Sequence, residues 1–131
     1  MTTMRYIALD YGDKKVGIAV SGEEGSMGFP LRVVKNDDSL FNDVLALVRE
    51  YNAEVVLGDS RTLGGVENPI AKAIHAFADR LTKESIVVHF EPEYFTSKEA
   101  ERIQGRTPNT DASAAAIMLT SFLTRTRNQH A

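Results

Sequence analysis

The segment Arg5–Ser21, which reads RYIALDYGDKKVGIAVS, decides the fold. Residues 5–10 place their largest apolar side chains on one face and end with Asp10 on the other, which is the period of a β-strand. Residues 15–21 alternate in the same way. Only residues 11–14 separate the two predicted strands, so the strands form an antiparallel hairpin. A flavodoxin-like sheet is disfavoured, because it needs a helix directly after its first strand.

The rest of the chain predicts helices alternating with strands. After a third strand near residues 29–34, apolar residues recur every three or four positions over residues 40–51, which predicts a helix capped by Asp37 or Asp38. The later elements are a strand at 54–58, a helix at 70–81 opened by Asn68 and Pro69, a strand at 85–90 ended by Pro92, a charged helix at 96–104, and a buried helix from Thr110. This order predicts an α/β, RNase H-like fold: helices flank a five-stranded mixed sheet with strands 1–3 antiparallel and strands 1, 4 and 5 parallel.

Composition and charge limit the class of protein. The 131 residues are 43% hydrophobic and 25% charged, which predicts one compact domain over residues 1–131 rather than a disordered chain. The chain has no cysteine, no membrane-length apolar run and no signal-peptide pattern, so we expect a cytoplasmic protein without membrane contact. The net charge is −3, but residues 95–131 hold five basic and three acidic residues, which is compatible with phosphate contacts.

Carboxylates follow the parallel strands of the predicted sheet. Asp10 ends the first strand, Glu91 and Glu93 follow the fifth strand, and Asp111 opens the last helix. The carboxyl ends of parallel strands share one edge of a sheet, where ligands bind. Clustered carboxylates repel one another unless a cation neutralises them, and Mg²⁺ or Mn²⁺ prefers oxygen ligands. The topology therefore predicts a divalent-metal site at this edge, suited to phosphodiester cleavage.

Each of these acids also has a purely structural interpretation. Asp10 could be a turn residue beside Gly12, Asp111 could complement the dipole of its helix, and Glu91 and Glu93 could be solvated loop acids. The conjunction of all of them at one edge favours the functional interpretation.

Other chemistries fit the sequence poorly. Ser60 follows Gly58-Asp59 as in small serine esterases, but the three histidines show no matching arrangement for a general base. The histidines also lack zinc-ligand spacing, and no phosphate-binding P-loop occurs. Asp10-x-Gly12 also opens the phosphate loop of actin-like ATPases, but those proteins need a second domain that this length does not provide.

Four blocks of the chain carry a family resemblance. They are Ile7–Ala19, with the sequence IALDYGDKKVGIA; Val55–Pro69, with its Gly64-Gly65 pair; Glu93–Ala100; and Asp111–Leu119. In order and spacing they resemble the blocks of the YqgF family, also called RuvX-like Holliday junction resolvases or pre-16S rRNA nucleases. The match covers nearly the whole chain, and the opening block is its most specific part.

The resemblance implies an RNase H-like nuclease that acts on structured nucleic acid. The acidic triad of the family corresponds to Asp10, Glu93 and Asp111, which would carry catalysis and bind Mg²⁺ or Mn²⁺. The choice of Glu93 over Glu91 comes from the family pattern alone, because both residues point to the same face of the strand.

The chain departs from the family pattern at several positions. Residues 58–61 read Gly-Asp-Ser-Arg where the family has Gly-Leu-Pro, residues 92–94 read Pro-Glu-Tyr in place of Asp-Glu-Arg, and residues 108–110 lack the usual basic residue. The lost cations would weaken contact with phosphates. The candidates for replacing them in substrate binding are Lys14, Arg61 and Arg106.

Two hypotheses follow. The first is a metal-dependent nuclease that processes pre-16S rRNA or cleaves Holliday junction DNA. The second is a catalytically weak module that binds nucleic acid or a ribosome precursor. The retained acidic residues favour the first hypothesis, and the eroded basic positions favour the second.

Overall fold

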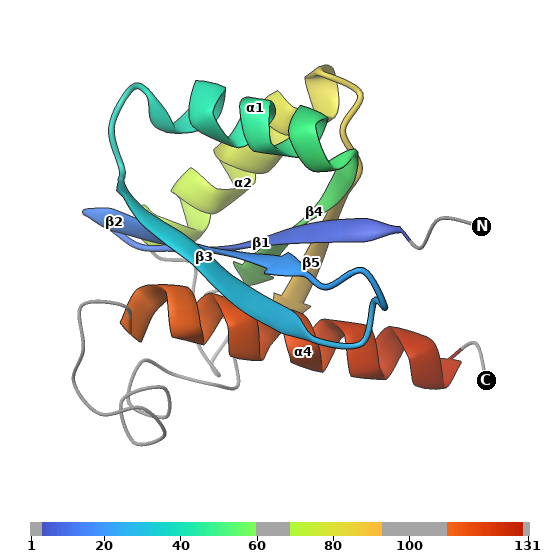
Figure 1. Ribbon diagram of the computed structural model, residues 1–131. Coiled ribbons are helices and arrows are strands. Elements are labelled where there is room, and N and C mark those ends of the chain that lie inside the picture. The colour runs from blue at the N-terminus through green and yellow to red at the C-terminus, as the bar shows by residue number, and fades with distance from the viewer. Residues whose placement is uncertain (1–3, 60–68, 93–109, 130–131) are drawn as a thin grey trace.

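The computed structural model describes residues 4–59, 69–92 and 110–129, and Figure 1 shows their arrangement. The chain forms a hairpin of β1 (Arg5–Tyr11) and β2 (Lys15–Ser21), followed by β3 (Gly28–Lys35) and α1 (Leu40–Tyr51). The elements that follow are β4 (Ala53–Asp59), α2 (Pro69–Lys83), β5 (Val88–Pro92) and α4 (Thr110–Gln129). None of the helices in the described part of the chain is long and apolar enough to cross a membrane.

The five strands form one mixed sheet with β1 at its centre. Their order is β3-β2-β1-β4-β5. β1 runs antiparallel to β2, with Asp10 opposite Gly17, and parallel to β4, with Leu9 opposite Leu57. β4 and β5 are also parallel, with Gly58 opposite Glu91. This topology confirms the predicted mixed sheet and its strand directions.

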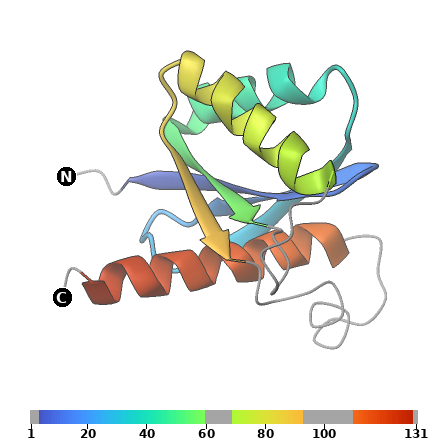
Figure 2. The same ribbon diagram turned by 180° about the vertical axis from the view of Figure 1, so that it is seen from behind.

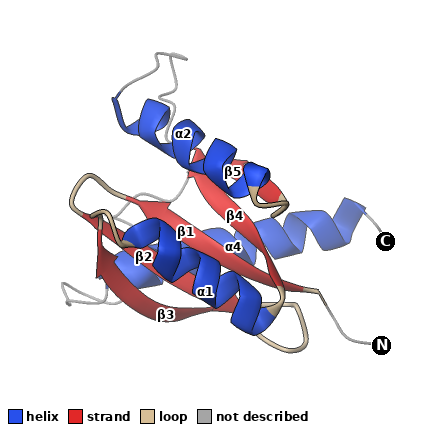
Figure 3. Cartoon of the chain, turned by 90° about the horizontal axis from the view of Figure 1, so that it is seen from above, coloured by secondary structure: helices blue, strands red, loops and turns tan. Residues whose placement is uncertain are grey.

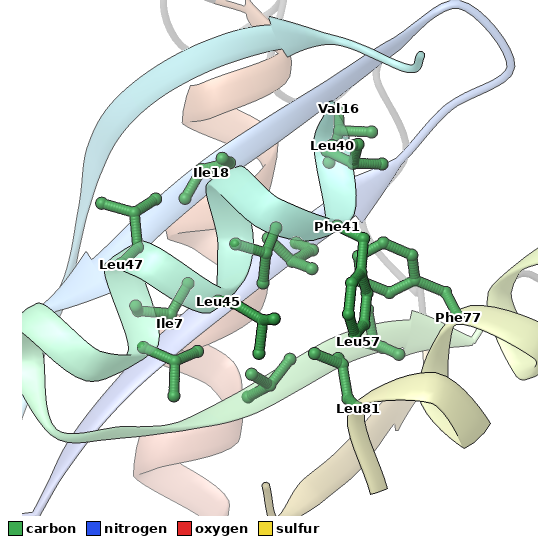
Figure 4. Close-up of a cluster of buried hydrophobic side chains, with 14 of the residues drawn as sticks. Ile7, Val16, Ile18, Leu40, Phe41, Leu45, Leu47, Leu57, Phe77 and Leu81 are labelled. Atoms are coloured by element: carbon green, nitrogen blue, oxygen red, sulfur yellow. The ribbon is translucent and has the colours of Figure 1, made fainter. Parts of the chain in front are cut away.

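Helices α1 and α2 cover one face of the sheet (Figures 1 and 3). Alternation along β1 sends Ile7 and Leu9 to this face, as the sequence predicts, and both side chains are fully buried. Figure 4 shows Ile7 in one cluster with Leu45, Phe41 and Phe77 from the two helices, and Leu9 belongs to the same cluster. Burial of these large apolar side chains holds the two helices on the sheet.

Among the helices of the described residues, α4 is the one that covers the opposite face (Figure 2). The sheet offers it small side chains such as Ala8 and Ala19, which pack against Ala115 and Leu119 of the helix. Contact is closest at Gly28 on β3, where an added Cβ would lie 2.8 Å from the carbonyl oxygen of Ala116. The fit requires small residues, because larger ones would push the helix away from the sheet.

The ends of two elements differ from the prediction. The fifth strand begins at Val88 rather than at residue 85, because the backbone after α2 is used to close the helix: the Ile86 N–H bonds the Leu81 carbonyl, and Ser85 adopts a positive φ of 64°. The strand also includes Pro92 as its last residue, a position at which the missing N–H of proline is tolerated.

Helix α1 is not capped as predicted. Its N-cap residue is Ser39. Asp37 lies before the cap, and its Oδ1 accepts a hydrogen bond of 2.9 Å from the Ser39 N–H. The helix predicted over residues 96–104 lies outside the described residues.

Candidate active site at the carboxyl edge of the sheet

Asp10 lies near the carboxyl end of β1, the central strand of the sheet. It is half-buried and alternates with Leu9, so it shares the face of α4 with Tyr6 and Ala8. Asp10 pairs with Gly17 on β2, and the preceding residue, Leu9, pairs with Leu57 on β4. The structure therefore places Asp10 near the carboxyl end of the central strand, and its catalytic or metal-binding role stays a prediction.

Asp111 is the second residue of α4, and the direction of that helix relates it to Asp10. Near the far end of α4, the ring of Phe122 lies 5.3 Å from that of Tyr6, at the start of β1. About two turns earlier, Ala115 packs in the same cluster as Ala8. Moving back along α4 thus means moving forward along β1, so the first turn of α4 lies toward the carboxyl end of β1 (Figures 1 and 2).

The other predicted site residues fall differently. Lys14 is exposed in the turn after β1, and Asn36 fixes this turn by donating hydrogen bonds to the carbonyls of Lys14 (2.9 Å) and Gly12 (2.8 Å). Glu93, Arg61 and Arg106 lie outside the described residues. Over residues 4–59, 69–92 and 110–129, no three His, Cys, Asp or Glu side chains gather closely enough to hold a metal ion.

Glu91 has a role that the sequence did not reveal. The sequence allows it to be either the middle carboxylate of the site or a solvated loop acid, yet it is only 2% exposed and lies within β5 on the α4 side. Ser121 donates a hydrogen bond of 3.2 Å to its Oε2, and the Arg125 guanidinium forms an ion pair with its Oε1. Burial raises the pKa of the Glu91 carboxyl, while Arg125 and Ser121 act in the opposite direction.

A second polar pair lies on the same face, nearer the start of the strands. His89 Nε2 is 2.7 Å from Glu54 Oε1, and the imidazole ring also contacts the rings of Tyr6 and Phe122. Burial raises the pKa of the Tyr6 hydroxyl, and the negative charge of Glu54 adds to this effect. No local sequence pattern indicates this polar group, because its members come from four different elements.

Comparison with known proteins identifies the family. Residues 4–125 match the family model RuvX, described as Holliday junction resolvase. This chain belongs to the RuvX family. Three of the four family blocks in the sequence correspond to β1 and β2, to the end of β4, and to the first half of α4, and these elements carry Asp10 and Asp111. The block Glu93–Ala100 lies outside the described residues.

Curated RuvX relatives extend over most of the chain. A protein of Dictyoglomus turgidum named "Putative pre-16S rRNA nuclease" is 36% identical over 104 residues, covering 76% of this chain and 74% of its own. A protein of the same name from Nitratidesulfovibrio vulgaris is 33% identical over 132 residues, covering 92% and 93% of the two chains.

Solved structures place the RuvX chain among resolvases in fold. The RuvC of Thermus thermophilus, solved with a Holliday junction substrate, has a TM-score of 0.61 at 17% identity and covers 95% of this chain and 96% of its own. The Holliday junction resolvase of fowlpox virus, solved with junction DNA, has a TM-score of 0.60 at 16% identity, with coverages of 94% and 99%. At these identities the likeness concerns the fold alone.

Proposed function

We propose that this chain is a divalent-metal-dependent endonuclease that hydrolyses phosphodiester bonds in structured nucleic acid. The observation that supports the proposal is the relation between β1 and α4: Asp10 lies near the carboxyl end of the central strand on the α4 face, and the first turn of α4 lies toward the same end of β1. Membership of the RuvX family supports the same activity. We propose that residues 1–131 act as one nuclease domain in the cytoplasm.

The donor set suits Mg²⁺ or Mn²⁺. We propose that Asp10, Glu93 and Asp111 hold the ion, because all three supply carboxylate oxygens, the ligands that these hard cations prefer. These residues would hold the ion, which would supply activation of water and compensation of phosphate charge. The strand position of Asp10 contributes orientation, since its backbone pairs with Gly17 on β2.

Phosphate contacts come from basic residues near this edge. Lys14 is exposed in the turn that directly follows β1, four residues beyond Asp10, so its ammonium group is free to reach a bound nucleic acid strand. We propose that Arg61 and Arg106 make further contacts of this kind.

The substrate that the relatives favour is RNA. Relatives at 33–36% identity are named as pre-16S rRNA nucleases, whereas the resolvases solved with junction DNA share only 16–17% identity. We therefore propose a precursor of 16S rRNA as the natural substrate, with four-way junction DNA as the competing one.

A cleavage assay tests the proposal. Purified protein is incubated with precursor 16S rRNA and, separately, with a four-way DNA junction, each with Mg²⁺, Mn²⁺ or a chelator. We expect cleavage of the RNA only with metal, and its loss in Asp10→Asn, which keeps the shape but removes one charge and one good ligand. Cleavage that persists in Asp10→Asn, or that continues in chelator, would contradict the proposal.

The alternative is a module that binds nucleic acid without efficient cleavage. The specific observation in its favour is the loss of family residues around Asp59 and Glu93, including an arginine that is replaced by Tyr94. Under this alternative, the parent protein and Asp10→Asn bind the RNA with equal affinity in a gel-shift assay, and neither protein cleaves it.

A further inference from the structure

Glu91 is the one ionisable side chain that is buried in the described part of the chain. Its side chain is 3% exposed, and each of its two oxygens has a partner on α4: Oε2 accepts from Ser121, and Oε1 pairs with Arg125. Ser121 and Arg125 are one helical turn apart, so they reach the carboxylate from the same face of the helix. This geometry fixes both the position and the orientation of the Glu91 side chain.

Strand β5 needs such an anchor more than the other strands do. It has five residues, lies at one edge of the sheet, and among the described strands pairs only with β4. Helix α4, in contrast, packs mainly on β1, β2 and β3, so these three strands determine where the helix lies. The Glu91 pair ties the edge strand to this well-supported helix, next to the ring contact of His89 with Phe122.

The two members of the pair differ in exposure: the Glu91 side chain is 3% exposed, whereas the Arg125 side chain is 48% exposed. Removal of the carboxylate from water offsets part of its attraction to the guanidinium, so the pair adds little to stability. It does, however, hold two elements in one relative position, because its hydrogen bonds are directional. The Glu91–Arg125 pair is therefore better suited to fixing geometry than to increasing the free energy of unfolding.

We propose that Glu91 and Arg125 are positioning residues that hold the carboxyl end of β5 against α4 and so set the spacing of the acidic site. The chain continues from β5 directly to Glu93, and α4 begins with the turn that carries Asp111. This inference rests on the proposed function, because it concerns the same site. Glu91 itself faces Arg125 and Ser121, and its role is to place its neighbours.

The experiment compares a charge-free pair with a matched control. In Glu91→Met/Arg125→Met, unbranched apolar side chains replace both charges, and in Arg49→Met/Glu50→Met the same exchange is made on exposed positions of α1, across the sheet. Mn²⁺ affinity is measured from the loss of the free-ion paramagnetic resonance signal, melting temperature by circular dichroism, and kcat and KM on precursor 16S rRNA.

We expect the Glu91/Arg125 double variant to melt close to the parent but to bind Mn²⁺ about tenfold or more weakly, as when outer-shell support of a metal site is lost. Its kcat falls while KM for the RNA stays near the parental value, because phosphate contacts are intact. The control variant keeps the parental Mn²⁺ affinity and kcat. Arg125→Lys, which keeps a positive charge beside Glu91, retains more Mn²⁺ affinity than Arg125→Met.

The failures of the two proposals are distinguishable. If the parent protein neither binds Mn²⁺ nor cleaves the RNA, the proposed function is wrong and the inference falls with it. If the parent does both, and the double variant matches it in Mn²⁺ affinity and kcat, the positioning role is overturned while the function stands. If the double variant does not fold, Glu91→Gln and Arg125→Lys are measured in its place, and parental Mn²⁺ affinity in both overturns the inference.

Discussion

Asp10 is the residue on which function and stability should separate most clearly. Carboxylates that converge on a metal site repel one another without metal, so Asp10→Asn should leave the metal-free protein as stable as the parent, or more stable. Mn²⁺ should stabilise the parent by about 2.7 kcal/mol at a hundredfold excess over Kd, and the variant by less. Melting curves of both proteins, with and without Mn²⁺, measure the difference. A variant that is destabilised without metal and gains equally from Mn²⁺ would mean that Asp10 is a structural residue.

Tyr6 gives the fold a measurable dependence on alkaline pH. Burial and the charge of Glu54 hold the pKa of its hydroxyl above the usual value, so the unfolded chain ionises first as pH rises. The contribution of Tyr6 to stability is therefore complete below the unfolded pKa of about 10 and is lost as pH rises toward the folded pKa. We expect the free energy of unfolding to fall less steeply above about pH 10 in Tyr6→Phe than in the parent. Urea titrations at neutral and alkaline pH provide the slopes, and equal slopes would refute the assignment.

At the scale of elements, the contact of β3 with α4 depends on a missing side chain. In Gly28→Ala the new Cβ would meet the Ala116 carbonyl oxygen and the Leu119 Cβ, both at 2.8 Å, and neither atom is the end of a flexible side chain. We expect the overpacking to lower the free energy of unfolding by about 1–3 kcal/mol. Urea denaturation of the variant measures this loss.

Gly22→Ala is the matched control for that change. Its Cβ would also approach another atom to 2.8 Å, but that atom belongs to the ring of Phe29, which is half-exposed and can move aside. The control should lose clearly less stability than Gly28→Ala. Equal losses would show that the closeness of α4 does not decide the effect.

The sequence predicted the elements better than it predicted their contacts. Alternation along β1 and β2 is a local signal, and it was sufficient for the strands, their directions and the faces of Leu9 and Asp10. The start of β5 was missed because closure of α2 consumes the backbone up to Ile86, which depends on the path of the chain. Glu91 was missed for a similar reason: its partner Arg125 is 34 positions away, and no local pattern announces such a pair.

At the scale of the whole molecule, the sheet separates two apolar clusters. Leu57 is fully buried on the side of α1 and α2, and Leu119 is fully buried on the side of α4. Each Leu→Ala change should lower the free energy of unfolding by about 2–5 kcal/mol. Because the sheet lies between the two sites, their losses should add within about 0.5 kcal/mol in the double variant. Urea denaturation of all four proteins tests additivity, and a larger coupling would mean that the two clusters respond as one.

The contact of Tyr6 with Phe122 has a practical consequence for handling the protein. It places the start of β1 beside the later turns of α4, on the side of the molecule away from the edge where β1 ends (Figure 1). An affinity tag or surface tether joined before β1 or after α4 would therefore extend away from that edge. Protein immobilised in either way would present the carboxyl edge of the sheet to the solution.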